Sequence, residues 1–203
     1  MIRIAILVLV TILLWFMSSP NKDARKISNK DLPILILVIL CAGYPSHLFH
    51  EFGHWLVGTL LGNEMSMGLN RAWPVSGNYF QESHELFILL GGPSFTILQA
   101  IIALLLIEKY RTIYAYPFLF TSFFDRFFPL TFATFAEQDE ARISAILRLG
   151  TYTIAIIICF VLFVFVWRGS RTLKLHFYTI SAFFLWTFVS LLIVMGTNKL
   201  LYS

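Results

Sequence analysis

A glutamate and several histidines interrupt one of the most apolar stretches of this chain of 203 residues. The segment SHLFHEFGHWLVG (46–58) contains the pattern H-E-x-x-H, formed by His50, Glu51 and His54. On an α-helix, residues four positions apart are offset by only about 40° around the axis, so both imidazoles would face the same way and could bind one metal ion. Glu51 would lie within reach of a water molecule on that metal and could act as a general base. The pattern predicts a metal-dependent hydrolytic centre.

Zinc suits this centre, because it accepts imidazole and carboxylate ligands in tetrahedral geometry and lowers the pKa of bound water toward about 7. Two histidines do not complete a catalytic zinc site, which has three protein ligands and one open position. Asp125, in SFFDRFF, has the most apolar surroundings among the candidates for the third ligand, although Arg126 and other basic groups could pair with it. The run FAEQDEARISAILRLG (135–150) offers three carboxylates, of which at least two are expected to be solvated or paired with Arg142. The candidates in or beside later apolar runs are Glu82, His84, Glu85, Asp125, Glu137, Asp139 and Glu140.

The apolar surroundings of the motif favour a function over the alternative of ordinary buried polar residues. A charged side chain at the centre of a membrane helix costs about 3 kcal/mol on insertion scales, and such residues usually face the interior of a bundle. His47 shares the face of the motif one turn earlier. We interpret it as an accessory or capping residue near a kink at Pro45, or alternatively as a group that steers protons. Three glycines are expected to permit close helix packing: Gly53, Gly58 and Gly62.

The composition indicates an integral membrane protein. Hydrophobic residues make up 58% of the chain and charged residues 13%, with a mean hydropathy of +0.78, whereas a soluble domain has about 25% charged residues. Cys41 and Cys159 both lie in apolar runs, which indicates buried thiols rather than a disulfide. The first apolar run could be a signal peptide, but no convincing cleavage site follows it, so we expect an uncleaved helix. The runs long enough to span a membrane are 2–18, 33–61, 85–107, 113–136, 150–167 and 174–196.

We therefore predict an all-α integral membrane fold, a polytopic bundle of about six transmembrane helices that form one transmembrane domain (1–203). An N-terminal helix and polar linker (1–31) precede a metalloprotease-like core (32–150), and two C-terminal helices follow (151–203). The polar stretch 62–85 contains Gly, Asn and Pro, and its short alternating segments could form a β-like hairpin after the H-E-x-x-H helix.

Basic residues indicate how the chain lies in the membrane. Three segments (18–31, 109–111 and 168–174) carry nine of the fifteen lysines and arginines. If every run crosses the membrane once, these segments share one side, which the positive-inside rule makes cytoplasmic, and both termini lie outside. His50 and His54 would then lie toward the outer end of their helix. Because the charge resides in loops, it indicates topology, and no nucleic-acid partner is expected.

Three features together resemble the site-2 protease family (M50 type) of intramembrane zinc metalloproteases. They are HEFGH in a membrane helix, LLGGPSFTIL (89–98) in the next apolar run, and a carboxylate after a later run. The resemblance covers roughly 45–150. In that family two histidines and a distant aspartate bind zinc, the glutamate is the general base, and a helix containing Gly-Pro, here Gly92-Pro93, neighbours the site.

The resemblance implies one zinc ion per chain, bound by His50, His54 and Asp139, with Glu51 as the catalytic base. Asp139 is matched because QDEARISAILRLG resembles the aspartate-containing segment of smaller family members. The asparagine and prolines that precede Asp-Gly in the fuller family signature are missing here, and there is no PDZ-like insertion. The implied partners are the lipid bilayer and a transmembrane protein or peptide substrate. The implied location is a bacterial inner membrane, with the zinc nearer the cytosol than the basic residues indicate.

Other interpretations stay open at this point. An HtpX-like membrane zinc protease would use Glu137 or Glu140 in place of Asp139. A noncatalytic metal-binding membrane protein, such as a transporter component or an assembly factor, would have no need of Glu51. Residues 64–80 could form a membrane-associated β-like segment to which an extended substrate adds as a strand, or a plain connecting loop.

Overall fold

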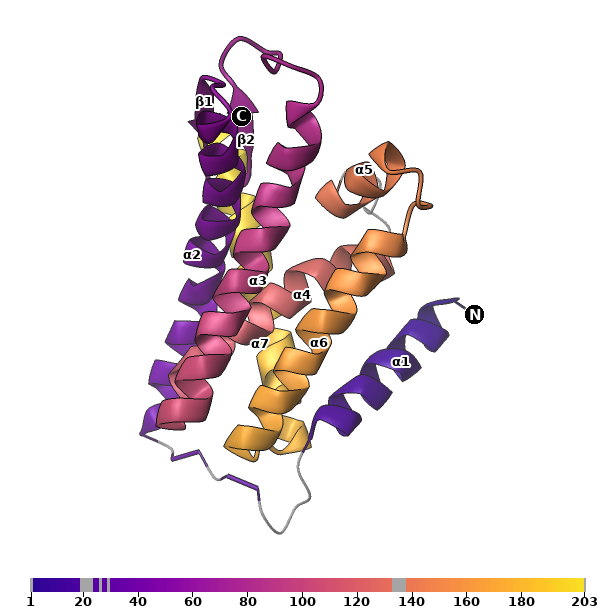
Figure 1. Cartoon of the computed structure of the whole chain (residues 1–203). Helices are drawn as coiled ribbons and strands as arrows, with labels where there is room; N and C mark the ends of the chain where they lie inside the picture. The colour runs from indigo at the N-terminus through magenta and orange to yellow at the C-terminus, as the bar shows by residue number, and fades with distance from the viewer. Residues whose placement is uncertain (1, 19–23, 26, 29, 133–137, 203) are drawn as a thin grey trace.

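A computed structural model describes most of the chain as a helical bundle (Figure 1). The described residues are 2–18, 24–25, 27–28, 30–132 and 138–202. In chain order its elements are α1 (Ile2–Met17), α2 (Asp31–Leu60), β1 (Met65–Met67), β2 (Ala72–Pro74), α3 (His84–Tyr110), the 3-10 helix η2 (Ile113–Ala115), α4 (Tyr116–Phe132), α5 (Asp139–Ile146), α6 (Thr153–Leu173) and α7 (Phe177–Tyr202). The predicted all-α class agrees with this architecture.

Within the described residues, four helices are long and apolar enough to cross a membrane, namely α2, α3, α6 and α7. The sequence predicts six spans, and that number is not confirmed. The runs 2–18 and 113–136 correspond to α1, with 16 residues, and α4, with 17 described residues. At about 1.5 Å per residue these helices are about 25 Å long, which is shorter than the hydrocarbon core of about 30 Å. The four long helices are sufficient to identify a membrane protein.

Helices α2 and α3 cross where glycine faces glycine. A Cβ atom placed on Gly53 would lie 2.8 Å from the carbonyl carbon of Gly91, so the two backbones are in direct contact. Gly58 instead faces the side chain of Met65. The expected packing role of Gly62 is wrong, because this residue lies beyond the end of α2 with a φ of +83° and has no atom within 4 Å of a Cβ. Its left-handed conformation, which glycine adopts at no steric cost, turns the chain toward β1.

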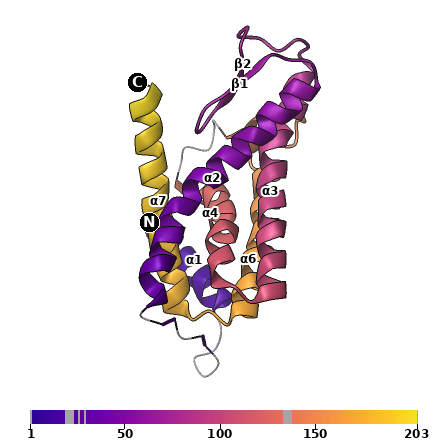
Figure 2. The same cartoon turned by 90° about the vertical axis from the view of Figure 1, so that its left-hand side faces the viewer.

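Helix α4 lies inside the bundle, where it contacts α2, α3, α6 and α7 (Figure 2). Tyr116, Phe120 and Phe124 are fully buried along it. The ring of Tyr116 lies edge-on to Phe183 of α7, with 4.7 Å between centroids. Close packing of several large aromatic side chains holds α4 in place, because van der Waals contact drives helix association in a membrane. By contrast, apolar side chains on the outer faces of the long helices are exposed, as lipid contact requires; they include Leu37, Phe87, Leu105, Phe160 and Leu185.

A two-stranded antiparallel sheet follows α2, in the polar stretch where the sequence suggests a hairpin or a loop. Its register pairs Met65 with Pro74 and Met67 with Ala72. The indole N–H of Trp55 on α2 donates to the Met65 carbonyl oxygen at 3.2 Å, which ties the sheet to the helix. The sheet therefore lies beside the last turns of α2, close to the H-E-x-x-H motif (Figure 2).

The three basic segments meet at one end of the bundle. The Arg25 guanidinium donates to the Arg111 carbonyl oxygen at 2.9 Å, and the Arg25 backbone N–H donates to Lys174. The Arg111 guanidinium donates to the carbonyl oxygen of Thr172 at 2.8 Å. The expectation that these segments share one side agrees with this geometry. The sheet and α5 lie toward the opposite end, and α2 continues through Pro45 without ending there (Figure 1).

Cysteine labelling checks this arrangement. In a chain that carries Cys41→Ser and Cys159→Ala, single cysteines are introduced as Ser76→Cys near the sheet and Tyr110→Cys at the basic end. We expect a membrane-impermeant maleimide to label Ser76→Cys in intact cells and Tyr110→Cys only after permeabilisation, because basic segments stay cytoplasmic. Labelling of both positions from the same side would contradict a membrane crossing by α3.

Candidate metal centre

His50 and His54 project from one face of α2 into the bundle. Their imidazole centroids are 4.8 Å apart, as expected for residues one helical turn apart. His50 is 6% exposed and His54 7% exposed, and Glu51 beside them is also 7% exposed. The predicted shared face of the two histidines therefore exists, and it lies in the interior.

Asp139, the first residue of α5, completes a group of three. Its Oδ2 lies 3.0 Å from Nε2 of His50 and 3.1 Å from Nε2 of His54, and the two Nε2 atoms are 3.2 Å apart. In a tetrahedral zinc site with bonds of about 2.0–2.1 Å, neighbouring ligand atoms are about 3.3 Å apart. These three side chains could therefore bind one metal ion, and their geometry fits zinc.

Hydrogen bonds on the far side of each ring determine which nitrogen faces Asp139 with a lone pair. The Thr96 hydroxyl donates to the Gly92 carbonyl oxygen, so it accepts from Nδ1–H of His50 at 2.9 Å. Nδ1 of His54 lies 2.6 Å from the Ile88 carbonyl oxygen, which can only accept, so this nitrogen donates too. The backbone N–H of Gly92 approaches the same nitrogen only at 3.4 Å, a longer and weaker contact. With Nδ1 as the donor, each imidazole in its neutral form presents a lone pair on Nε2, as metal ligands do.

The Gly-Gly-Pro segment of α3 leaves room for the rings. A Cβ atom on Gly92 would lie 2.6 Å from Nε2 of His50 and closer still to Nε2 of His54. The three atoms nearest to this Cβ would all belong to the two imidazoles. The Cβ would lie where the lone pairs of the rings converge. Glycine is therefore required at position 92 by the candidate metal centre itself, and Pro93 beside it is buried in the same helix.

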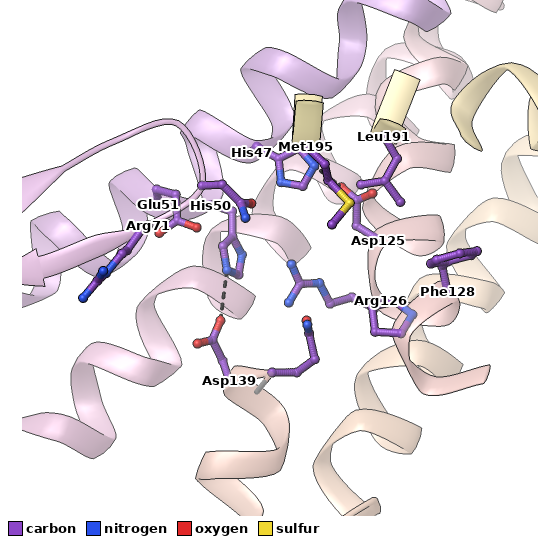
Figure 3. A pocket seen from close by; sticks show the side chains of 13 residues that line it. His47, His50, Glu51, Arg71, Asp125, Arg126, Phe128, Asp139, Leu191 and Met195 are labelled. Atoms are coloured by element: carbon purple, nitrogen blue, oxygen red, sulfur yellow. Dashed lines mark hydrogen bonds and ion pairs between the residues drawn. The ribbon is translucent and has the colours of Figure 1, made fainter. Parts of the chain in front are cut away.

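Glu51 and Asp139 line two neighbouring cavities. The first, of about 480 Å³, extends from the histidines toward α4 and α7 (Figure 3). The second, of about 390 Å³, extends toward the sheet, where β2 forms part of the wall. Ala72 on β2 and Glu51 on α2 both line this second cavity. Water or an extended peptide therefore has space on either side of Glu51.

Polar groups also reach the second cavity from the loop after the sheet. Tyr79 lines it, and partial burial raises the pKa of this phenol despite the opposing effect of Arg142. The Tyr79 hydroxyl is therefore protonated at neutral pH and can donate a hydrogen bond. From the connection between β1 and β2, Arg71 lines the same cavity, with its guanidinium 5.4 Å from the centre of the Trp73 ring.

The structure does not bring Asp125 to the histidine pair. Its Oδ2 lies 3.6 Å from Nε2 of His47, and both residues line the first cavity. Of the basic groups that could pair with Asp125, His47 lies beside it, whereas the Arg126 guanidinium donates to Glu140. Consecutive residues on a helix point about 100° apart, and which neighbour each of them meets depends on the tertiary structure.

The remaining candidates for the third ligand also lie elsewhere. Glu85 pairs with Arg142, and Glu140 is occupied by Arg126. Nδ1 of His84 lies 3.2 Å from the side-chain nitrogen of Asn63. Glu82 is not part of the group of three, and Glu137 lies outside the described residues. Among the described candidates, only Asp139 reaches both histidines.

Sequence reasoning missed Thr96 and the Ile88 carbonyl, the two groups that orient the imidazoles. A sequence signal for Thr96 exists, because its side chain places a hydroxyl group one helical turn after Gly92 in a largely apolar run. No signal could indicate Ile88, because every residue carries a backbone carbonyl.

Comparisons of the chain with protein-family models, curated proteins and solved structures find no match.

Asp125 and Asp139 provide a test of ligand identity. We expect elemental analysis to find about one zinc per chain in the purified wild type, and close to none after His54→Ala or Asp139→Ala, because each removes one of three ligands. Asp125→Ala serves as the matched control and should retain zinc. Loss of zinc from Asp125→Ala, with retention in Asp139→Ala, would place the third ligand on α4.

A methyl group at position 92 tests the space around the imidazoles. Gly92→Ala should weaken zinc binding by roughly 10–100-fold or more, the range for changes around a zinc ligand, because the new Cβ displaces both rings. Gly196→Ala on α7 is the control, since no atom lies within 4 Å of its Cβ. Competition with a chelating dye measures both affinities. Equal affinities in the two variants would show that the centre does not occupy this space.

Proposed function

We propose that this chain is an intramembrane zinc endopeptidase of the site-2 protease type, acting in the inner membrane of a bacterial cell. One observation carries the proposal. Lone pairs of His50, His54 and Asp139 converge at 3.0–3.2 Å, with the opposite nitrogen of each imidazole already committed as a donor. Converging acceptors need a cation between them. Zinc bound there would polarise a substrate carbonyl and acidify a water molecule.

Glu51 supplies the proton transfer in this proposal. Its carboxylate is buried next to His50 and borders both cavities. From this position it can take a proton from the attacking water and return it to the nitrogen of the leaving amine. A protein that only stores or transports a metal does not need a buried carboxylate at this place, so Glu51 favours catalysis over the binding alternative.

The substrate class follows from the surroundings of Glu51. The cavity toward the sheet is bounded by Ala72, Trp73 and Pro74 of β2, and within the described residues β2 pairs only with β1. A peptide bond inside a helix is shielded by its own hydrogen bonds and must be extended before water can attack it. A membrane-embedded or membrane-adjacent segment that lies extended along β2 would present its backbone to Glu51.

The HtpX-like alternative requires a glutamate as the third ligand. Glu140 is held by Arg126, and Asp139 is the carboxylate that meets both histidines. This geometry favours the aspartate-based site.

The substitution Glu51→Gln tests the proposal directly. Wild type and variant are reconstituted in liposomes with a set of single-span membrane peptides, and products are identified by mass spectrometry. We expect cleavage to fall by about 10²–10⁴-fold, because the base is lost, while zinc content stays at the wild-type level. Cleavage at the wild-type rate would remove Glu51 from the reaction. Absence of products from a zinc-loaded wild type would favour a metal-binding protein.

A further inference from the structure

Helix α5, which carries Asp139, is tied to the rest of the bundle by two ion pairs. Arg126 on α4 contacts Glu140, and Arg142 contacts Glu85 at the start of α3. With only eight residues, α5 depends on tertiary contacts, because isolated helices shorter than about 12 residues are unstable in water. The position of Asp139 therefore depends on whatever anchors α5.

The two ion pairs differ greatly in burial. The side chains of Arg126 and Glu140 are 9% and 3% exposed, whereas those of Arg142 and Glu85 are 47% and 36% exposed. Nη1 of Arg126 lies 3.1 Å from one carboxylate oxygen of Glu140 and 3.4 Å from the other. A buried pair of this kind specifies geometry strongly, because separation would leave a charge without a partner away from water. An exposed pair is screened by solvent and contributes little.

Glu140 directly follows Asp139 in the chain. On a helix, consecutive side chains point about 100° apart, so the direction of one sets the direction of the other. When Glu140 turns toward Arg126 on α4, Asp139 turns toward His50 and His54 on α2. Arg126 itself extends from the aromatic-packed helix α4 toward Asp139 (Figure 3).

We propose that the Arg126–Glu140 ion pair is the positioning device of the metal centre: it fixes the rotation and height of α5 so that Asp139 reaches both histidines. The proposal rests on the metal-binding part of the proposed function and not on peptide hydrolysis. Arg126 and Glu140 are positioning residues, which act on the metal through Asp139.

Zinc affinity of the purified full-length protein tests this proposal. The variants Arg126→Gln and Glu140→Gln should each bind zinc about 10–100-fold more weakly than wild type, as for other residues that orient a metal ligand. The double variant should lose about as much zinc affinity as either single variant, because the same ion pair is removed in all three. Glu85→Gln on α3 and Arg142→Gln on α5 remove the exposed ion pair of the same helix α5 and are the matched controls. Their zinc affinity should stay close to that of wild type.

Cobalt separates positioning from general loss of stability. Visible absorption of the cobalt-loaded protein reports the geometry of the ligands, so it should change in Glu140→Gln and stay unchanged in Glu85→Gln. If Glu140→Gln does not fold, Arg126→Lys, which keeps the charge but not the fork of donors, replaces it and should weaken zinc binding in the same direction.

Wild-type affinity and an unchanged cobalt spectrum in Glu140→Gln or Arg126→Lys would overturn the positioning role while leaving the metal centre intact. A wild type that binds no zinc would overturn the metal centre and the positioning role together. Zinc binding without peptide cleavage would count against the proposed protease activity alone. The three failures are therefore distinguishable.

Discussion

Three lone-pair acceptors meet within hydrogen-bonding distance of one another inside a bundle of apolar helices. Nitrogens of His50 and His54 and an oxygen of Asp139 lie 3.0–3.2 Å apart, in surroundings where electrostatic interactions are strong. Such an arrangement is costly without a cation. Other features of this region hold these atoms together. They are the glycines of α3, the hydrogen bonds from the two imidazoles to Thr96 and Ile88, and the anchoring of α5.

The contact between α2 and α3 connects the fold to the site. Because Gly53 and Gly91 allow the two backbones to touch, Gly92 lies against the imidazoles and Thr96 lies within reach of His50. A larger residue at either glycine would separate the helices and remove Thr96 from its partner. Close helix packing, which needs small residues in membranes, is therefore also the means by which the histidines are oriented.

The two ends of the bundle differ in character. Basic segments gather at one end, and the sheet and α5 lie toward the other (Figures 1 and 2). With the basic end in the cytoplasm, the candidate centre faces the outer half of the membrane. Under the proposed function, a substrate would then be attacked near the outer surface, which differs from the cytosolic side that the family resemblance implies.

The sequence by itself determined the local features of this protein. Helical spacing places His50 and His54 on one face, hydropathy identifies the long membrane helices, and neither requires knowledge of distant residues. Helix number was less predictable, because a run such as 113–136 has the composition of a span while the described part of its helix α4 has 17 residues, fewer than the roughly 20 that a span needs.

Only the tertiary structure decided which carboxylate joins the histidines. Asp125 lies within an apolar segment and Asp139 follows one, but α4 directs Asp125 toward His47, while α5 places Asp139 beside His50 and His54. Side-chain direction depends on how each helix is rotated against its neighbours, and that rotation is set by contacts between residues far apart in the chain. Sequence spacing fixes angles within one helix and carries no information on the angle between two helices.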